Sequence, residues 1–255
     1  MNRKYFLLQI LIISNTLVSA QSRLKDNNTI GWYGLFTTTK FNTKWSLAAE
    51  MQYRRVGLIT NGQQNLFRTG ITYQPDTKLM FRVGYARAQT FPYGVYPLNA
   101  MGKTFTENRF FEMVTINDNI KNLSINHRFI LEQRFVGRYS SPELVNQDQT
   151  VYSNRIRYMF RIDCPLKKTN PTNNAPYIAA FNEVFIGFGK NVGENVFDQN
   201  RLGILFGFKF NSLIKIEMGY LNQIVQLGRE VDNKNVFQYN QGLQLNTFFN
   251  FSTAK

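Results

Sequence analysis

The sequence predicts an all-β fold, an antiparallel up-and-down transmembrane β-barrel of about 10 to 12 strands. Three observations support this prediction. Apolar and polar residues alternate with a period of two in about eleven segments. Short turns and longer loops follow one another between these segments, and their polar faces are rich in arginine and glutamate. Strands of about ten residues with one apolar and one polar face, joined in this way, are typical of outer-membrane barrels.

The first segment, residues 1–20, has the pattern of a cleaved signal peptide. Arg3 and Lys4 precede an apolar stretch, which ends in the small residues Val18-Ser19-Ala20. An uncleaved membrane anchor is the alternative, which the short, interrupted apolar run disfavours. Residues 21–255 contain no linker and no run long enough for a spanning helix, so we expect a single outer-membrane β-barrel domain. The predicted location is the cell outer membrane, and the predicted partners are outer-membrane lipid and the barrel-assembly machinery.

The clearest strand lies at 44–54, where every second residue from Trp45 to Tyr53 is apolar or aromatic and Glu50 and Arg54 lie on the opposite face. Further strands are predicted, in chain order, at 67–73, 79–85, 122–135, 152–163, 177–188, 201–210, 214–220 and 237–251. Short turns are expected at 41–43, 74–77, 117–121 and 211–212, and long loops near 55–64, 88–104, 136–150, 189–197 and 227–235. The segment 164–176 breaks this alternation, because it is long where a short turn is expected.

One segment, 95–116, fits the pattern poorly because Glu107, Arg109 and Glu112 do not share a face. Single-chain bacterial barrels have even numbers of strands. We therefore expect that a strand is missed, or two are merged, in this segment.

The segment 122–135 shows how the two faces divide. Its lipid-facing residues are predicted to be Leu123, Ile125, Phe129, Leu131 and Phe135, and its interior residues Arg128, Glu132 and Arg134. Aromatic girdles at the membrane surfaces are predicted from Tyr53, Tyr73, Tyr85, Tyr158, Tyr220 and Tyr239. His127 falls on the lipid face, where a local bulge could turn it inward. A soluble β-sandwich also has alternating strands, but it has less need of aromatic girdles.

The charged residues of the polar face are predicted to meet in the lumen of the barrel. The predicted lumen cluster consists of Glu50, Arg54, Arg82, Arg128, Glu132, Arg134, Arg155, Arg157, Arg161, Glu183, Arg201 and Glu217. Rings of arginine and lysine favour anions, so one interpretation is a narrow anion-favouring pore that takes a small anionic solute. The other is a plugged structural barrel, in which arginine and glutamate pair and fill a narrow interior.

Other functional classes receive less support. No catalytic, cofactor-binding or metal-binding residues are predicted: the chain has one His, one Cys and no clustered carboxylates. An outer-membrane lipid acyl hydrolase would need His127 and a serine, but Ser124 lies three residues away on the opposite face of the strand, so the serine would have to come from a neighbouring strand. The net charge of +14 raises the alternative hypothesis of a basic, exported nucleic-acid-binding protein. We expect no nucleic-acid partner, because arginines and aromatic residues are predicted on opposite faces.

Several short stretches resemble a Bacteroidota outer-membrane β-barrel family, domain of unknown function 2490. They are Trp32 at the start of the first strand, Glu50 with Arg54, Gly84-Tyr85, Glu107-x-Arg109, HRFILEQRF (127–135), NRIRY (154–158), CPL (164–166), NEVF (182–185), FDQNRLG (197–203) and EMGYLNQ (217–223). The resemblance implies a β-barrel of unknown role and supplies no catalytic residue or ligand. Barrels of this kind often end on an aromatic residue, whereas Ser252 to Lys255 follow Phe251 here.

Overall fold

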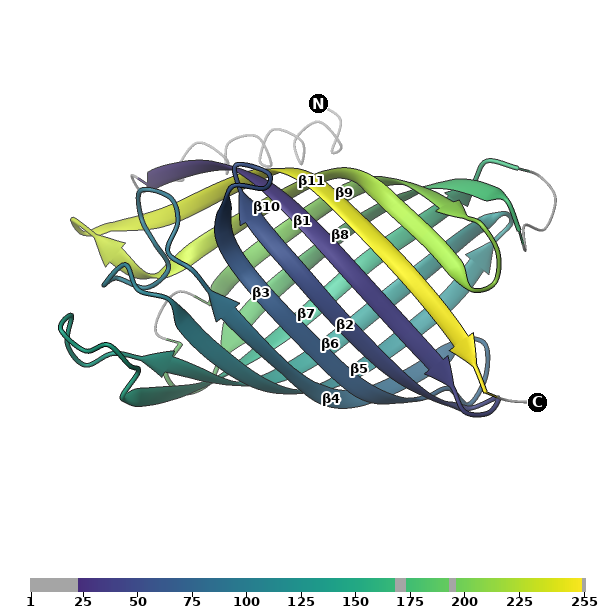
Figure 1. The fold of residues 1–255 in the computed structure, drawn as a ribbon, viewed down its shortest axis with the longest axis horizontal. Coiled ribbons are helices and arrows are strands. Elements are labelled where there is room, and N and C mark those ends of the chain that lie inside the picture. The colour runs from purple at the N-terminus through teal and green to yellow at the C-terminus, as the bar shows by residue number, and fades with distance from the viewer. Residues whose placement is uncertain (1–22, 168–172, 193–195, 254–255) are drawn as a thin grey trace, which may run out of the picture.

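A computed structural model describes residues 23–167, 173–192 and 196–253. The predicted signal peptide, 1–20, lies outside the described residues. Within them, eleven strands close into one barrel (Figure 1). The strands are β1 (Leu24–Lys40), β2 (Trp45–Val56), β3 (Asn61–Tyr73), β4 (Leu79–Thr90), β5 (Phe105–Ile120), β6 (Leu123–Arg138), β7 (Gln149–Pro165), β8 (Ala175–Phe188), β9 (Phe197–Lys209), β10 (Ile214–Val231) and β11 (Lys234–Ser252). The predicted all-β barrel is confirmed.

The barrel closes through a parallel pair of strands. β1 and β11 run side by side from the pair Leu24 and Val236 to the pair Lys40 and Ser252, whereas the other neighbouring strands are antiparallel. When successive strands alternate in direction, an odd number leaves the first and last strands pointing the same way, so the seam between them must be parallel. The expectation of an even strand number is therefore wrong for the described part of the chain. The segment 95–116 contributes one strand, β5, with no second strand hidden in it.

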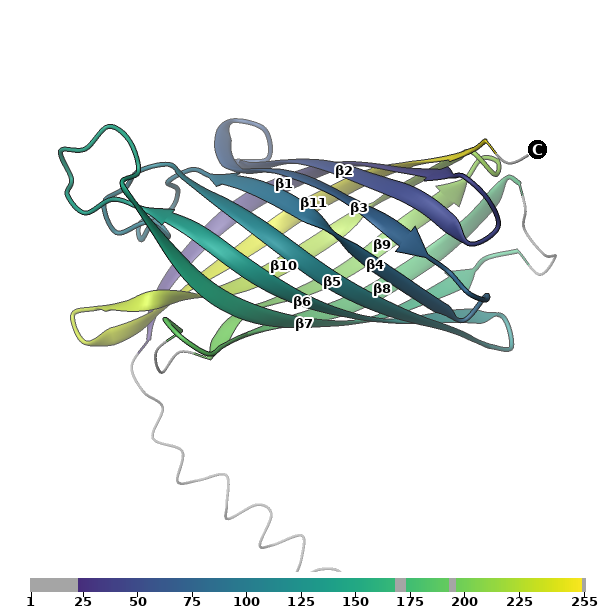
Figure 2. The same cartoon turned by 90° about the horizontal axis from the view of Figure 1, so that it is seen from below.

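The two ends of the barrel differ in their connections (Figure 2). Three tight turns lie at the end of the barrel where β11 terminates. In each of them, an Asn or Asp side chain accepts two backbone hydrogen bonds. Asn42 Oδ1 accepts from the amides of residues 44 and 45, Asp76 Oδ1 from those of 78 and 79, and Asn211 Oδ1 from those of 213 and 214, at 2.7 to 2.9 Å. These local bonds replace ladder bonds and fix each turn. We call this end the turn end and the opposite one the loop end.

The longest connection at the loop end, residues 91–104, folds across the mouth of the barrel. The Tyr93 hydroxyl is buried in the lumen and accepts hydrogen bonds from Gln63 Nε2 at 3.2 Å and Asn240 Nδ2 at 3.3 Å. Further along the loop, the amide of Tyr96 donates to Asp26 Oδ2 at 3.1 Å. The loop is thus tied to β1, β3 and β11, and it narrows the opening from this side.

Burial alternates along the strands as a barrel with two different faces requires. Leu131 is 38% exposed, whereas the next residue, Glu132, is 1% exposed. Every strand contributes exposed apolar residues to the outer wall, among them Leu35, Leu47, Ile71, Val83, Phe110, Leu131, Ile156, Ile178, Ile204, Met218 and Leu243. The described residues include no helix long and apolar enough to cross a membrane.

Candidate functional site

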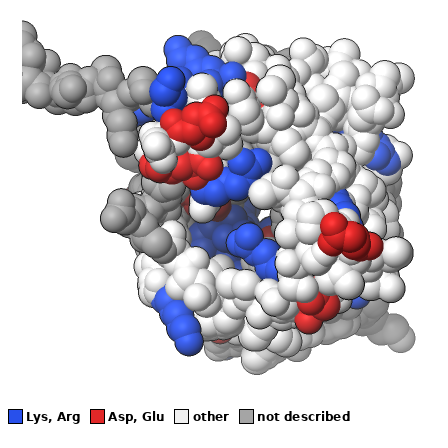
Figure 3. All heavy atoms as spheres, turned by 90° about the vertical axis from the view of Figure 1, so that its left-hand side faces the viewer, with Lys and Arg blue, Asp and Glu red and all other residues white. Residues whose placement is uncertain are grey.

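The interior of the barrel holds two cavities. The turn-side cavity has a volume of about 570 Å³, and the loop-side cavity about 230 Å³. Three residues, Trp32, Arg54 and Arg201, line both cavities, so the two spaces meet at these side chains. From the loop end, the surface is hollowed, and basic side chains lie inside the hollow (Figure 3).

Both cavities are lined by more basic than acidic side chains. Among the described residues, eight basic and five acidic ones line the turn-side cavity, and six basic and two acidic ones line the loop-side cavity. The interior therefore carries a positive excess on either side of the junction. A positive lining attracts anions and repels cations.

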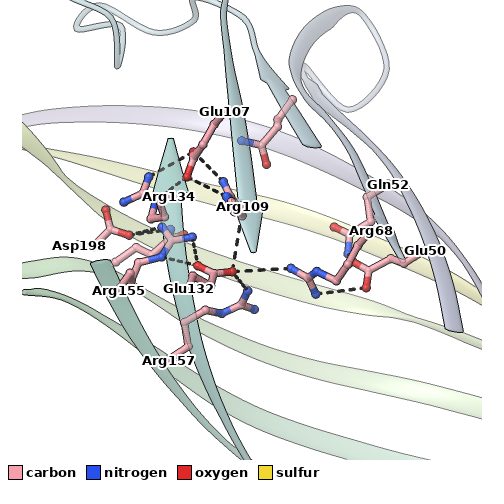
Figure 4. A network of polar contacts seen from close by, with 12 residues as sticks. Glu50, Gln52, Arg68, Glu107, Arg109, Glu132, Arg134, Arg155, Arg157 and Asp198 are labelled. Atoms are coloured by element: carbon pink, nitrogen blue, oxygen red, sulfur yellow. Dashed lines mark hydrogen bonds and ion pairs between the residues drawn. The ribbon is translucent and has the colours of Figure 1, made fainter. Parts of the chain in front are cut away.

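A buried carboxylate on β6, Glu132, stands at the centre of the charged side of the lumen (Figure 4). Its two oxygens accept from Arg155 at 2.5 Å and Arg157 at 2.8 Å, both on β7. Arg109 and Arg68 reach the same carboxylate at 4.0 Å. One buried carboxylate is thus shared by four guanidinium groups.

Further carboxylates extend this cluster in both directions. Glu107 accepts from Arg109 at 2.8 Å and from Arg134 at 2.5 Å, and Asp198 accepts from Arg155 at 2.5 Å (Figure 4). On the other side, Glu183 is shared by Arg157 at 2.7 Å, Arg128 at 2.9 Å and Arg201 at 3.7 Å, and Glu50 pairs with Arg68 at 3.2 Å. We call this set, without the more distant Arg201, the ionic network: Glu50, Arg68, Glu107, Arg109, Arg128, Glu132, Arg134, Arg155, Arg157, Glu183 and Asp198.

The residues of the predicted lumen cluster lie in the interior, but not all of them pair. Ten of the twelve predicted residues take part in ion pairs, including Glu217 and Arg161, which bond to each other at 2.6 Å outside the ionic network. The exceptions are Arg54 and Arg82. Arg54 is bound by glutamine oxygens, and Arg82 Nε donates to Thr72 Oγ1 at 2.7 Å.

Four residues of the ionic network are missing from the predicted lumen cluster: Arg68, Glu107, Arg109 and Asp198. Glu107 and Arg109 face inward, whereas Glu112 faces outward, where its carboxylate accepts from Gln133 at 3.0 Å. The conflict between these positions was therefore caused by one outward acid rather than by an irregular strand. Asp198 was missed for a different reason, a β-bulge.

Two β-bulges place consecutive polar residues in the lumen. Between β2 and β3, Arg54 opposes Gln64 and Arg55 opposes Gly62, which leaves Gln63 as an extra residue. Gln63 and Gln64 consequently both line the loop-side cavity. A bulge re-aims side chains by breaking the two-residue period.

The second bulge does the same on the other side of the lumen. Between β8 and β9, Phe185 opposes Gln199 and Ile186 opposes Phe197, so Asp198 is the extra residue. Asp198 and Gln199 both line the loop-side cavity. No strict alternation of faces could have predicted this.

Neutral amides form a second polar group in the interior, which we call the amide cluster: Gln63, Gln199, Gln223, Gln238 and Asn240. Trp32 Nε1 donates to Gln63 at 2.6 Å, Gln63 to Gln223 at 3.4 Å, and Gln223 to Gln199 at 2.7 Å. Asn240 also donates to Gln223, at 3.2 Å. All five amides are less than a tenth exposed. The cluster therefore links Trp32 to the residue that holds Arg201.

Two guanidinium groups stack on the ring of Trp32. The Arg54 Cζ lies 3.9 Å from the ring centroid and the Arg201 Cζ 4.8 Å. Phe185 also faces inward, with Arg157 and Arg201 within 4.5 Å of its centroid. The expectation that arginines and aromatic residues occupy opposite faces is therefore wrong for this part of the lumen. We call Trp32, Arg54 and Arg201 the Trp32 junction.

His127 keeps its predicted place on the outer wall. It pairs with Ile116 and Phe160 without a register shift, so the bulge that could turn it inward is not present in β6. Its Nδ1 lies 2.8 Å from the Tyr158 hydroxyl, whereas Ser124 Oγ donates to Asn119 on the neighbouring strand. Among the described residues the histidine thus has a tyrosine partner, and this geometry gives a serine hydrolase no support.

In the described part of the chain, no three His, Cys, Asp or Glu residues are grouped so that they could hold a metal ion. Cys164 is free and exposed.

The comparisons with known proteins concern the barrel as a whole. No curated protein matches the sequence. A solved structure titled as the NanC porin in a rhombohedral crystal form is similar, with a TM-score of 0.44 and 11% identity, over 82% of this chain and 92% of that one. The model of a family described as proteins of unknown function, DUF2490, matches residues 29–235. The chain therefore belongs to the DUF2490 family.

Proposed function

We propose that this protein is an integral outer-membrane β-barrel whose lumen admits small anionic solutes. The observation that carries the proposal is the contrast between the two faces of the wall: apolar outside on every strand, and basic inside on both sides of the Trp32 junction.

The outer wall supports a membrane location. Soluble monomers rarely expose apolar patches larger than a few hundred Å², whereas here exposed apolar side chains run around the barrel. Phe206 is 53% exposed, Ile204 53% and Met218 57%. Lipid would cover such a surface at no hydrophobic cost, and a closed barrel leaves no unpaired sheet edge in the bilayer. The rings of Trp45 and Tyr73 lie near the turn end in a tilted arrangement, with their centroids 4.7 Å apart, as expected of girdle residues. We assign insertion to the barrel-assembly machinery.

The lumen supports an anionic solute. The basic excess is present in both cavities, so a solute meets a positive wall on entering from either end. The loop 91–104 and the Trp32 junction narrow the path, which favours small solutes.

The alternative is a plugged structural barrel, in which the ionic network fills the lumen. Pairs such as Arg155 with Glu132 do occupy part of the interior. The cavity of about 570 Å³ at the turn end favours the pore, because a barrel filled only for stability has no need of such a space.

Swelling of proteoliposomes tests this function. Vesicles that contain the refolded mature chain, valinomycin and trapped dextran are diluted into isotonic potassium chloride, so that entry of the anion limits swelling. We expect swelling that protein-free vesicles lack, and slower swelling in potassium gluconate, whose anion is larger. A barrel shown to be folded and inserted, but without swelling in either salt, would refute the pore and leave the plugged barrel.

A further inference from the structure

The Trp32 junction differs from the ionic network in how its guanidinium groups are held. Arg54 donates Nε and Nη2 to Gln52 Oε1 at 2.9 and 2.6 Å, and Nη1 to Gln64 Oε1 at 2.7 Å. All three bonds end on neutral amide oxygens. Among the described residues no carboxylate lies within 4.0 Å of this guanidinium. The side chain is thus fixed in position by neutral partners, without a direct carboxylate contact in the described part of the chain.

Arg201 is held in a similar way. Its Nε and Nη2 donate to Gln199 Oε1 at 3.2 and 2.9 Å, and its single carboxylate contact in the described part, Glu183, lies at 3.7 Å. Glu183 is already engaged more closely by Arg157 and Arg128. Among the described residues, Arg201 therefore has no carboxylate within hydrogen-bonding distance.

The paired arginines of the ionic network show the contrast. Arg155 directs its donors to Glu132 and Asp198, and Arg157 to Glu132 and Glu183. Carboxylate partners of this kind compensate the guanidinium charge and use its fork of donors. Such arginines have few free N–H donors with which to bind a solute.

Two of the three glutamines that hold the junction lie beside β-bulges. Gln64 lies beside the bulge in β3 and Gln199 beside the bulge in β9, whereas Gln52 is on β2. Each bulge adds a polar residue, Gln63 or Asp198, to the lining of the loop-side cavity. Bulges that re-aim side chains in this way are common next to functional sites.

We propose that the Trp32 junction is an anion-binding site, built for a small solute with a carboxylate- or phosphate-type group. The ligand group accepts the N–H donors of Arg54 and Arg201 that the glutamines leave unused. The amide cluster holds the Trp32 ring through Gln63, so that the ring keeps both guanidinium groups at the junction. The inference deepens the proposed function and rests on it in one respect, that solutes enter the lumen.

Tryptophan fluorescence tests this site directly. The chain has two tryptophans, and Trp45 lies on the outer wall, 45% exposed. The Trp45→Phe variant therefore leaves Trp32 as the reporter of the lumen. We expect iodide to quench it several-fold more strongly than caesium, and acetate or inorganic phosphate to protect it from iodide.

A matched pair of charge changes separates the site from the lumen as a whole. In the Trp45→Phe background, Gln64→Glu places a carboxylate against Arg54, whereas Asn126→Asp adds the same charge to the turn-side cavity on β6, where Asn126 donates to Asn117 at 2.7 Å. We expect Gln64→Glu to lower iodide quenching and acetate protection several-fold, and Asn126→Asp to leave most of both. Acrylamide, a neutral quencher, checks that access is unchanged in both variants.

Equal losses in the two variants would overturn the proposal, since the effect would then belong to the general charge of the lumen. Iodide quenching no stronger than caesium quenching in the parent would overturn it as well. The outcome is independent of the swelling assay: quenching with protection by acetate, but without swelling, would keep the site and remove the pore.

Discussion

The ionic network and the amide cluster are both buried in the same lumen, yet they satisfy their polar groups in different ways. The ionic network balances charge against charge, with Glu132 shared among several arginines. The amide cluster joins neutral side chains into a chain from Trp32 to Gln199. This difference indicates which charged side chains of the lumen can still bind a solute. Charges that are already paired serve stability, and charges that amides hold remain able to bind.

The largest expected effect tests the ionic network. Glu132→Gln removes the carboxylate that Arg155 and Arg157 share and leaves both with less compensation. Breaking a buried ion pair from one side costs roughly 3–5 kcal/mol of unfolding free energy. Urea unfolding in lipid vesicles measures this decrease in the unfolding free energy. The control is Glu143→Gln in an exposed loop, for which we expect almost no change. Equal unfolding midpoints for the two variants would show that the network contributes little to stability.

The next effect tests the division between inner and outer faces on which the comparison depends. Leu131→Arg places a charge near the middle of the outer wall of β6. We expect Leu131→Arg to lower the unfolding free energy by about 2–4 kcal/mol, because a charge at the bilayer midplane is disfavoured. For Ile125→Arg, close to the turn end of the same strand, we expect a decrease of about 0–1 kcal/mol. Folding yield and unfolding free energy in vesicles give the answer. Similar losses at the two depths would contradict a lipid-facing β6.

A smaller effect is expected in the amide cluster. Gln223→Leu removes bonds to Gln63, Gln199 and Asn240 without leaving a charge uncompensated. The cost of leaving neutral partners unsatisfied is about 1–3 kcal/mol, below that of Glu132→Gln. Gln244→Leu, with one bond to Asn246, is the control. A loss larger than that of Glu132→Gln would reverse the ranking of the two groups.

The smallest effect on stability is expected from Asp76 at the turn end, which belongs to neither the ionic network nor the amide cluster. Backbone amides of Leu79 and Lys78 lower the pKa of Asp76 below its ordinary value of 3.8. A carboxyl with a lowered pKa in the fold adds stability above its unfolded pKa, and this contribution is lost as the pH falls through the folded value. Asp76→Asn keeps the acceptor oxygen but does not titrate. We expect the wild type to lose its small advantage over Asp76→Asn as the pH drops below 3.8. An unchanged difference at low pH would show that the turn gains nothing from the charge.

The sequence predicted the fold because a two-residue period reports directly which face each side chain occupies. Ten of the residues expected in the lumen take part in ion pairs in the structure, because charged residues at alternate positions are easy to recognise in the sequence. The parallel seam between β1 and β11 could not be predicted, because it depends on the strand number and not on any local pattern.

The Trp32 junction could not be predicted from the sequence, for two physical reasons. Bulges shift the period by one residue, so Gln63 and Asp198 fall on the wrong face of any strictly alternating strand. Neutral amides also carry no charge signal, although they decide which arginines stay uncompensated. The inward fold of loop 91–104 depends on contacts of Tyr93 with distant strands, which local sequence does not encode.

The most direct test of the central claim, that the uncompensated positive charge of the lumen selects anions, is the reversal potential of the refolded mature chain in a planar bilayer under a gradient of potassium chloride. We expect discrete conductance steps whose reversal potential has the sign of chloride selectivity. In Gln64→Glu, we expect the reversal potential to shift toward potassium. A reversal potential with the sign of potassium selectivity in the unmodified chain would refute anion selection by the lumen.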